Sequence, residues 1–219
     1  MSIKKKAVII GAGGHSHVVC DILLQDKTIE IVGLVDNYAE HGFYGIKLLG
    51  GDECLTRIFA DGIADYGFVA IGSNMLRKKL TEQIIKIGYG MVNAVSGGAF
   101  ISPNAVLGSG IAVMPGAVVN AGAVIGDGSI INTNGSVDHD TKISDFVHIA
   151  PGCAVCGNVL VGEGTFIGVG TSVIDGYSVG SNTMIGAGAS VVGDIPSNCT
   201  AVGVPAKVIK YNTQYDERQ

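Results

Sequence analysis

The sequence predicts a two-part protein, in which an α/β domain with a small parallel, Rossmann-like sheet precedes an all-β solenoid. Short apolar runs alternate with amphipathic stretches up to about residue 95, and from Ile101 onward aliphatic residues recur every six positions. The chain also contains 34 glycines in 219 residues, more than ordinary helical packing accommodates. We therefore expect the α/β domain over 1–96, the solenoid over 97–210 and a polar tail over 211–219.

Charge and hydropathy limit the kinds of partner that this chain can have. A formal net charge of −5 provides no general electrostatic footprint for nucleic acid. Gly, Asn and Asp interrupt every apolar run before it reaches the roughly 18 residues that a membrane span needs. The start, MSIKKKAVII, is basic and then apolar, but it leads directly into GAGGHS and not to a cleavage site. These features predict a cytoplasmic protein that binds neither nucleic acid nor membranes.

The five cysteines are an odd number and widely scattered, which argues against a disulfide framework. Cys153 and Cys156 form a CxxC pair, but no second pair and no histidine at zinc-site spacing accompany it. Both fall where the repeat places small residues. We assign them a structural role and expect no metal.

The first part of the chain alternates strands with helices, which implies a parallel sheet. KAVIIGAGG (6–14) reads as a buried strand entering a glycine-rich turn, and further strands are expected at 30–36, 66–72 and 89–95. Apolar spacings of three and four predict helices at 15–26, 51–60 and 74–88, the last with a basic outer face. Asp52 and the pair Ser73 and Asn74 are candidate N-caps for the second and third helices.

The second part carries an aliphatic residue at every sixth position without a break. These sixteen positions are Ile101, Leu107, Val113, Val119, Ile125, Ile131, Val137, Ile143, Ile149, Val155, Val161, Ile167, Val173, Val179, Ile185 and Val191. The residue two positions earlier is usually small, and glycine often follows one position later. A period of six fits neither an α-helix nor a hairpin, but it fits a solenoid of short strands with the aliphatic residue pointing inward. The glycines would permit left-handed or tight backbone at the corners.

This ladder, with GVPAK at 203–207 and an N-terminal GAGGHS, resembles the hexapeptide-repeat acyltransferases and, among them, the bacterial nucleotide-sugar acetyltransferases. The resemblance implies a left-handed parallel β-helix in which three hexapeptides make one triangular coil. It also implies a homotrimer that uses acetyl-CoA and acts on 4-amino sugars, with sialic acid O-acetyltransferases as close relatives.

Two histidines interrupt the repeat at one place. His139 stands two positions after Val137 and His148 one position before Ile149, so neither takes an inward position and both imidazoles can project outward. Nine residues are half of an 18-residue coil, so the two should lie on different sides of the triangle. In a trimer, His139 of one subunit could then meet His148 of its neighbour, with the active site between subunits.

The resemblance also implies roles for particular residues in this window. His139 followed by Asp140 matches a general base oriented by an acid, although many relatives carry Glu at the second position. Asn132, seven residues earlier, matches a further catalytic residue. His148, nine residues after His139, and Gly157, nine residues after His148, match residues that contact acetyl-CoA. The glycine would do so through its backbone N–H. Lys207 is a candidate for the CoA phosphates by its charge, with a solvated surface lysine as the alternative.

These residue types suit acyl transfer to an amine. An amine that attacks a thioester must lose a proton, and neutral imidazole has a suitable pKa for accepting it. A carboxylate on the other ring nitrogen fixes the tautomer, and backbone donors can stabilise the oxyanion. The plain alternative is that His139 and His148 are solvated surface histidines, but the combined spacing with Asp140 and Asn132 favours the catalytic interpretation.

The segment GAGGHS (11–16) follows a strand and opens a helix, so its backbone amides can hold phosphates. It is not a full dinucleotide motif, because Ser16 replaces the third glycine. Asp36 could bind a ribose. In the resembling family this region binds the nucleotide-sugar, which implies substrate-binding roles for Gly13, Gly14, His15, Asp36, Ser73 and Asn74. His17 and His41 are expected to be surface residues.

The sequence therefore predicts an acetyl-CoA-dependent N-acetyltransferase that acts on a nucleotide-linked 4-amino-4,6-dideoxy sugar. An O-acetyltransferase of sialic acid or a related sugar acid is an alternative, and it would have no use for diphosphate-binding amides. A non-catalytic sugar-nucleotide-binding scaffold is a second alternative.

Overall fold

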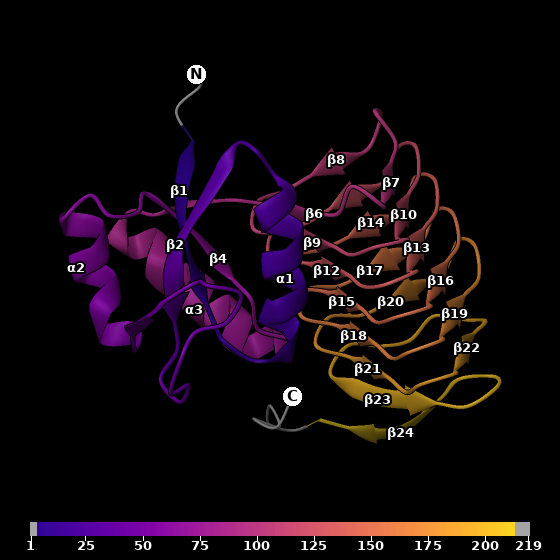
Figure 1. Ribbon diagram of the computed structural model, residues 1–219. Helices are drawn as coiled ribbons and strands as arrows, with labels where there is room; N and C mark the ends of the chain where they lie inside the picture. The colour runs from indigo at the N-terminus through magenta and orange to yellow at the C-terminus, as the bar shows by residue number, and fades with distance from the viewer. Residues whose placement is uncertain (1–3, 213–219) are drawn as a thin grey trace. The chain divides into compact units, whose positions relative to one another are not determined.

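A computed structural model describes residues 4–212 and shows two compact units, Met1–Val95 and Ser96–Gln219 (Figure 1). The first unit is an α/β domain, and the second is a left-handed parallel β-helix. The fold class expected from the sequence is confirmed. None of the helices within residues 4–212 is long and apolar enough to cross a membrane.

The first unit contains a five-stranded sheet whose neighbouring strands are all parallel, in the order β3-β2-β1-β4-β5. Its central strand, β1, buries Ala7 to Ile10 almost completely, as its uninterrupted apolar run requires. The strands are β1 (Lys5–Ile10), β2 (Ile29–Val35), β3 (Leu48–Gly50), β4 (Tyr66–Val69), β5 (Gly90–Met91) and the short β6 (Ala94–Val95); the helices are α1 (Gly14–Gln25), the 3₁₀ turn η1 (Asp52–Cys54), α2 (Leu55–Ala60) and α3 (Asn74–Ile87).

The two candidate helix caps have different outcomes. Ser73 is the N-cap of α3, and its hydroxyl accepts a hydrogen bond from the Leu76 N–H at 3.4 Å. The assignment of Asp52 as an N-cap is wrong. The chain first makes a 3₁₀ turn capped by Gly51, and a carboxylate oxygen of Asp52 accepts a hydrogen bond from the Asn37 side chain at 2.9 Å.

In the second unit, two-residue strands recur every six residues and form the three faces of the β-helix. From β7 to β19, each strand pairs with the strand 18 residues later, as Val119 pairs with Val137 and Val137 with Val155. The faces run β7-β10-β13-β16-β19-β22, β8-β11-β14-β17-β20 and β9-β12-β15-β18-β21-β23-β24. The strands are β7 (Phe100–Ile101), β8 (Val106–Leu107), β9 (Ala112–Val113), β10 (Val118–Val119), β11 (Val124–Ile125), β12 (Ile130–Ile131), β13 (Ser136–Val137), β14 (Lys142–Ile143), β15 (His148–Ile149), β16 (Ala154–Val155), β17 (Leu160–Val161), β18 (Phe166–Ile167), β19 (Ser172–Val173), β20 (Ser178–Val179), β21 (Met184–Ile185), β22 (Ser190–Val191), β23 (Cys199–Val202) and β24 (Lys207–Tyr211).

The last two strands form an antiparallel pair that ends the described part of the chain. GVPAK at 203–207 connects them and leads into β24, which continues through Tyr211. Strand β24 therefore reaches one residue into the stretch expected as a polar tail. Asn212 follows the strand, and its N–H donates to the Asn198 carbonyl oxygen at 2.7 Å; residues 213–219 lie outside the described part of the chain.

The aliphatic ladder forms the core of the β-helix. From Val113 to Val191 none of its members is more than 2% exposed, and Ile101 and Leu107 at the start are partly buried. The small residues two positions earlier carry the polar part of this core. Thr141, Thr165 and Thr183 each donate a hydroxyl hydrogen bond to a carbonyl of the following coil, at 2.7, 2.6 and 2.8 Å. Buried hydroxyls are thus satisfied without interrupting the ladder.

The glycine that follows many ladder positions serves close packing between coils. An added Cβ at Gly162 would lie 2.5 Å from the Ser181 nitrogen, because the backbone of the next coil passes directly above it. Of the two roles expected for the glycines, left-handed or tight backbone, Gly162 does not serve the left-handed one. Left-handed backbone occurs two residues further on, as at Gly164 (φ 68°) and Asp140 (φ 58°).

We predict that Gly162→Ala lowers the free energy of unfolding by about 1–3 kcal/mol, the usual cost of overpacking. The new methyl group would meet backbone atoms that cannot rotate away. Gly97→Ala is the matched control, because an added Cβ there meets no atom within 4 Å. Denaturant titration followed by circular dichroism measures both variants, and equal destabilisation would contradict the packing role.

Candidate functional site

His139 lies at the corner that follows β13, with an exposed imidazole. Its Nδ1 is 3.0 Å from the Asp140 Oδ2, and the side chain is 54% exposed. Asp140 occupies the left-handed position of the corner, a conformation that aspartate tolerates better than most residues. The hydrogen bond to Asp140 raises the pKa of His139 above its ordinary value, and the charges of Asp138 and Asp175 act in the same direction.

A second carboxylate holds the backbone of this corner. The His139 N–H donates to the Asp138 Oδ1 at 2.8 Å, and the Asn120 side chain of the preceding coil donates to the same oxygen at 2.9 Å. These two hydrogen bonds lower the pKa of the Asp138 carboxyl. Asp138 thus fixes the backbone from which the imidazole projects, while Asp140 fixes the ring.

Gly157 lies 18 residues after His139, at the same corner of the next coil. An added Cβ would be 2.5 Å from the His139 Cε1 and 2.7 Å from its Nε2, so only glycine allows the ring to lie this close to the backbone. Within residues 4–212 the Gly157 N–H donates no hydrogen bond, and the His139 Nε2 makes none either. A ring nitrogen and a backbone N–H that both lack a partner in the described chain therefore belong to residues in close contact, the exposed His139 and the buried Gly157.

The other two predicted residues of this window form a separate cluster. The Asn132 Nδ2 lies 3.0 Å from the His148 Nε2, and the His148 ring makes an edge contact with the Phe166 ring at 5.0 Å. His148 is only 8% exposed. The two imidazoles thus differ in exposure: His139 is accessible to solvent, whereas His148 is covered.

Within one chain, therefore, the predicted catalytic residues do not all come together. His139, Asp140 and Gly157 share one corner, whereas Asn132 lies beside His148. His139 follows β13 and His148 lies in β15, and these strands belong to different faces. The prediction that the two histidines lie on different sides of the triangle is confirmed.

The glycine-rich loop of the first unit precedes α1. Gly13 is the N-cap of α1, and the Ser16 hydroxyl donates to its carbonyl oxygen at 2.7 Å. An added Cβ at Gly13 or Gly14 would meet no atom of the chain within 4 Å. Packing inside the chain therefore does not require glycine at these two positions, which leaves space for a ligand to approach the backbone.

Asp36, at the end of β2, binds the glycine-rich loop from the side. Its Oδ2 accepts the Ala12 N–H at 2.8 Å, and its Oδ1 accepts the N–H groups of Tyr38 and Ala39 at 2.8 and 2.9 Å. Burial acts to raise the pKa of the Asp36 carboxyl, but these three donors outweigh it and lower the pKa. Asp36 thus organises two loops in addition to any contact with a ribose.

A buried cation supports the loop that follows β4. Arg77 is 1% exposed and donates to the carbonyl oxygens of Ile71 and Gly72, both at 3.0 Å, and to the Asn74 Oδ1 at 2.8 Å. Burial lowers its pKa to about 9. Burial, with the charge of Arg77 nearby, lowers the pKa of His15 to about 4, so this histidine is neutral at physiological pH.

Sequence reasoning missed Arg77 and assigned the basic residues of α3 to its outer face. The spacing of Arg77 with Leu80, Thr81 and Ile84 was the available signal, since residues three, four and seven positions apart share a helix face. All four are buried. Of the predicted residues, Ser73 caps α3 and Asn74 is held by Arg77.

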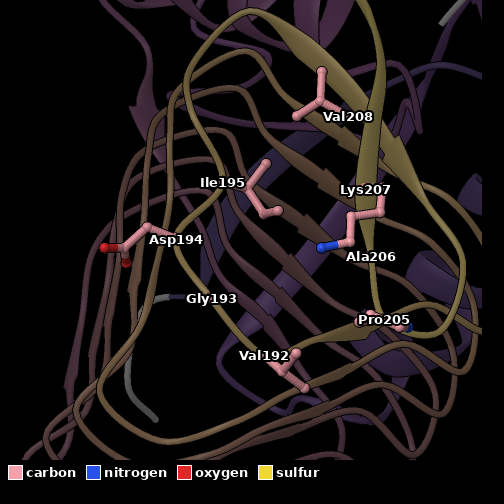
Figure 2. A pocket seen from close by; sticks show the side chains of 8 residues that line it. All are labelled: Val192, Gly193, Asp194, Ile195, Pro205, Ala206, Lys207 and Val208. Carbon is pink, nitrogen blue, oxygen red and sulfur yellow. The ribbon is translucent and has the colours of Figure 1, made fainter.

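Lys207 borders a pocket at the C-terminal end of the β-helix. The pocket has a volume of about 230 Å³ and lies between Val192–Ile195 and Pro205–Val208. Figure 2 shows the Lys207 side chain reaching across the pocket, with the Asp194 carboxylate directed away from it. An Asp194 oxygen accepts the Ser178 N–H and hydroxyl, both at 2.8 Å, and Lys207 makes no ion pair in the described part of the chain. The pocket therefore offers a positive charge to an anion.

No three His, Cys, Asp or Glu side chains among the described residues are placed to share a metal ion. Cys153 instead occupies a small-residue position of the repeat, where its thiol lies 3.0 Å from the Gly168 carbonyl oxygen. Burial raises the pKa of this thiol.

Comparison with known proteins identifies relatives of both units. Residues 6–84 match the PglD N-terminal domain family. A solved structure of a mutant perosamine N-acetyltransferase from Caulobacter crescentus, in complex with CoA and GDP-perosamine, is 40% identical, covers 95% of this chain and 98% of its own, and has a TM-score of 0.90. The acetyltransferase domain of PglB from Neisseria gonorrhoeae FA1090, in complex with acetyl coenzyme A, is 36% identical, covers 94% and 100%, and has a TM-score of 0.89.

A curated relative is an uncharacterized protein of Acanthamoeba polyphaga mimivirus, 32% identical over 110 residues, or 50% of this chain. The match covers 21% of that protein, so the aligned region spans about a fifth of the curated relative.

We predict that Asp140→Asn lowers the pKa of His139, because the variant loses the charged acceptor that stabilises the imidazolium. NMR titration of the imidazole signals, assigned with a His139→Gln variant, measures the shift. Asp127→Asn, at a different corner, is the control and should leave the His139 titration unchanged. An unaltered pKa in the Asp140 variant would show that the 3.0 Å contact does not hold the ring in solution.

Proposed function

Because the chain belongs to the hexapeptide-repeat nucleotide-sugar acetyltransferases, we propose that it transfers the acetyl group of acetyl-CoA to the amine of a nucleotide-linked 4-amino-4,6-dideoxy sugar. The observation that carries the proposal is the corner at which the free Nε2 of His139 lies beside the free N–H of Gly157. The reaction takes place in the cytoplasm, where acetyl-CoA is available.

In this mechanism His139 is the general base. The sugar amine attacks the thioester carbonyl as Nε2 accepts its proton, and Asp140 stabilises the imidazolium that forms. The Gly157 N–H donates to the carbonyl oxygen, which carries negative charge in the tetrahedral intermediate. When this intermediate collapses, the C–N bond remains, the C–S bond breaks, and the proton passes to the leaving thiolate of CoA.

The same corner offers a path for the remainder of CoA. Gly157, Asp175 and Gly193 follow His139 at intervals of 18 residues, so three coil spacings of about 4.8 Å place Gly193 about 14 Å from His139 along the axis. The pantetheine arm can span this length. Gly193 lines the Lys207 pocket, and we assign Lys207 to the CoA phosphates.

The nucleotide part of the second substrate belongs to the first unit. The open backbone at Gly13 and Gly14 and the N-terminus of α1 suit a diphosphate. Asp36 holds the loops that follow β1 and β2, and Arg77 holds the loop that follows β4, where Ser73 and Asn74 begin α3. His15 is kept neutral and can donate to or accept from the sugar without adding charge.

We further propose a homotrimer with active sites between subunits, since His139 and His148 lie on different faces of one chain. The face that contains β8, β11 and β17 supports an interface. Its outward residues Val106, Val124 and Leu160 are 59%, 37% and 51% exposed and stand in one column, with the exposed Lys142 between the last two. Several exposed aliphatic side chains on one face are typical of a surface that another protein covers.

The reaction is tested by following thiol release from acetyl-CoA with UDP-, GDP- and dTDP-linked 4-amino sugars. We expect turnover with one nucleotide and a loss of roughly 10²–10⁴-fold in kcat for His139→Ala, the usual contribution of a general base. Activity should rise with pH through the raised pKa of His139, because only the neutral ring accepts a proton.

Ser172→Ala, an exposed residue on the outer side of β19, is the control for that measurement and should retain full turnover. Acetylation of a free sugar acid with no turnover of any nucleotide-sugar would replace the proposal by O-acetylation. Bound acetyl-CoA with no turnover of either class would favour a non-catalytic scaffold.

The shared site is tested by mixing His139→Ala and His148→Ala subunits, each inactive alone. If one active site needs His139 of one subunit and His148 of another, co-expressed mixtures should regain about a quarter of the wild-type activity, since that fraction of randomly formed interfaces holds both histidines. Mixing the two purified proteins without subunit exchange is the control. No recovery in co-expressed trimers would place both histidines of each site in one chain.

A further inference from the structure

We propose that an aromatic surface beside the glycine-rich loop, formed by Tyr38, Phe43 and Tyr44, stacks the base of a nucleoside diphosphate. The inference rests on the proposed function and adds to it the part of the site that holds the base. All three residues lie in the loop between β2 and β3, which begins at the carboxyl edge of the sheet.

The start of this loop is tied to the glycine-rich loop. One carboxylate oxygen of Asp36 accepts the Ala12 N–H, and the other accepts the N–H groups of Tyr38 and Ala39. A single side chain therefore bridges the backbone of Tyr38 and the backbone that leads into α1. Any ligand whose phosphates reach the N-terminus of α1 comes close to this part of the loop.

The far part of the loop packs on the first turns of α1. The ring of Phe43 lies 4.1 Å from the ring of His17, which is three residues beyond Gly14, and the ring of Tyr44 lies 5.6 Å from it. Phe43 and Tyr44 meet edge to face at 5.1 Å. The loop is thus held against the diphosphate end of α1 at two points.

The turn that presents Tyr44 has an unfavourable backbone for its residue. The Ile46 N–H donates to the Phe43 carbonyl oxygen at 2.8 Å, and both central residues have positive φ, 52° at Tyr44 and 75° at Gly45. Such turns strongly favour Asn-Gly, and a bulky residue with positive φ is an outlier. Tyr44 is nevertheless 55% exposed, so burial of its ring within the chain does not offset this strain.

Tyr38 is available to a ligand to an unusual degree. Its side chain is 93% exposed, and across residues 4–212 its ring stacks on no other ring and its hydroxyl makes no hydrogen bond. Aromatic side chains stack on nucleobases regardless of base identity, through apolar contact and the faces of the rings. A base joined through its ribose to a diphosphate at Gly13 and Gly14 provides the aromatic partner that Tyr38 lacks, and it can also cover the exposed part of the Tyr44 ring.

The test is binding of the preferred nucleoside diphosphate by isothermal titration calorimetry, with no acetyl-CoA or sugar present. Tyr38→Ala/Tyr44→Ala should weaken binding by roughly tenfold or more, the effect of losing a base–aromatic stack, while Tyr38→Phe/Tyr44→Phe should bind as the wild type does. Tyr211→Ala, an exposed tyrosine of β24, is the matched control and should have no effect. Acetyl-CoA binding and circular dichroism report on the folding of each variant.

Wild-type affinity in the double alanine variant would overturn the proposal. Equal weakening in the double phenylalanine variant would also overturn it, because it would assign the effect to the hydroxyls. If the double alanine variant does not fold, the two single alanine variants are measured, and wild-type affinity in both overturns the proposal. A wild-type protein that binds no nucleoside diphosphate removes the nucleotide site altogether, whereas a protein that binds one but transfers no acetyl group leaves the aromatic surface standing and refutes only the reaction.

Discussion

The close stacking of 18-residue coils is the constraint on which the β-helix and its candidate site depend. Each two-residue strand pairs in register with the strand of the next coil, and the backbones approach so closely at Gly162 that no Cβ fits between them. Residues 18 positions apart therefore stand in columns. His139 lies against Gly157 because of this register, and a one-residue slip would replace the glycine by Cys156 or Asn158.

The fold could be predicted from the sequence to a large extent, because its physical signals are local and repeated. Sixteen aliphatic residues at a strict period indicate the inward positions, and all of them lie in or against one core. Corner geometry could not be predicted in the same way. Glycine serves left-handed backbone at Gly164 and close approach at Gly162, and the sequence shows the same letter for both.

The candidate site was predictable where neighbours in sequence are neighbours in space, as for His139 and Asp140. Spacing by nine also placed His139 and His148 on different faces, since it is half a coil. The burial of His148 and its pairing with Asn132 depend on three-dimensional packing that no local pattern records. Arg77 is a similar case. A buried arginine that holds three acceptors around one loop reads in the sequence as one more basic residue of an amphipathic helix.

The column geometry also makes the number of coils a molecular ruler. In the proposed CoA path, the distance from His139 to the Lys207 pocket equals a whole number of coil heights, each about 4.8 Å. Duplication of one 18-residue unit after β16 would leave the His139 corner intact and move the Lys207 pocket away by one step. In the proposed path, chain length in this part of the protein would thereby be matched to the length of the acyl carrier, and the two ends of the path could be adjusted only in steps of a full coil.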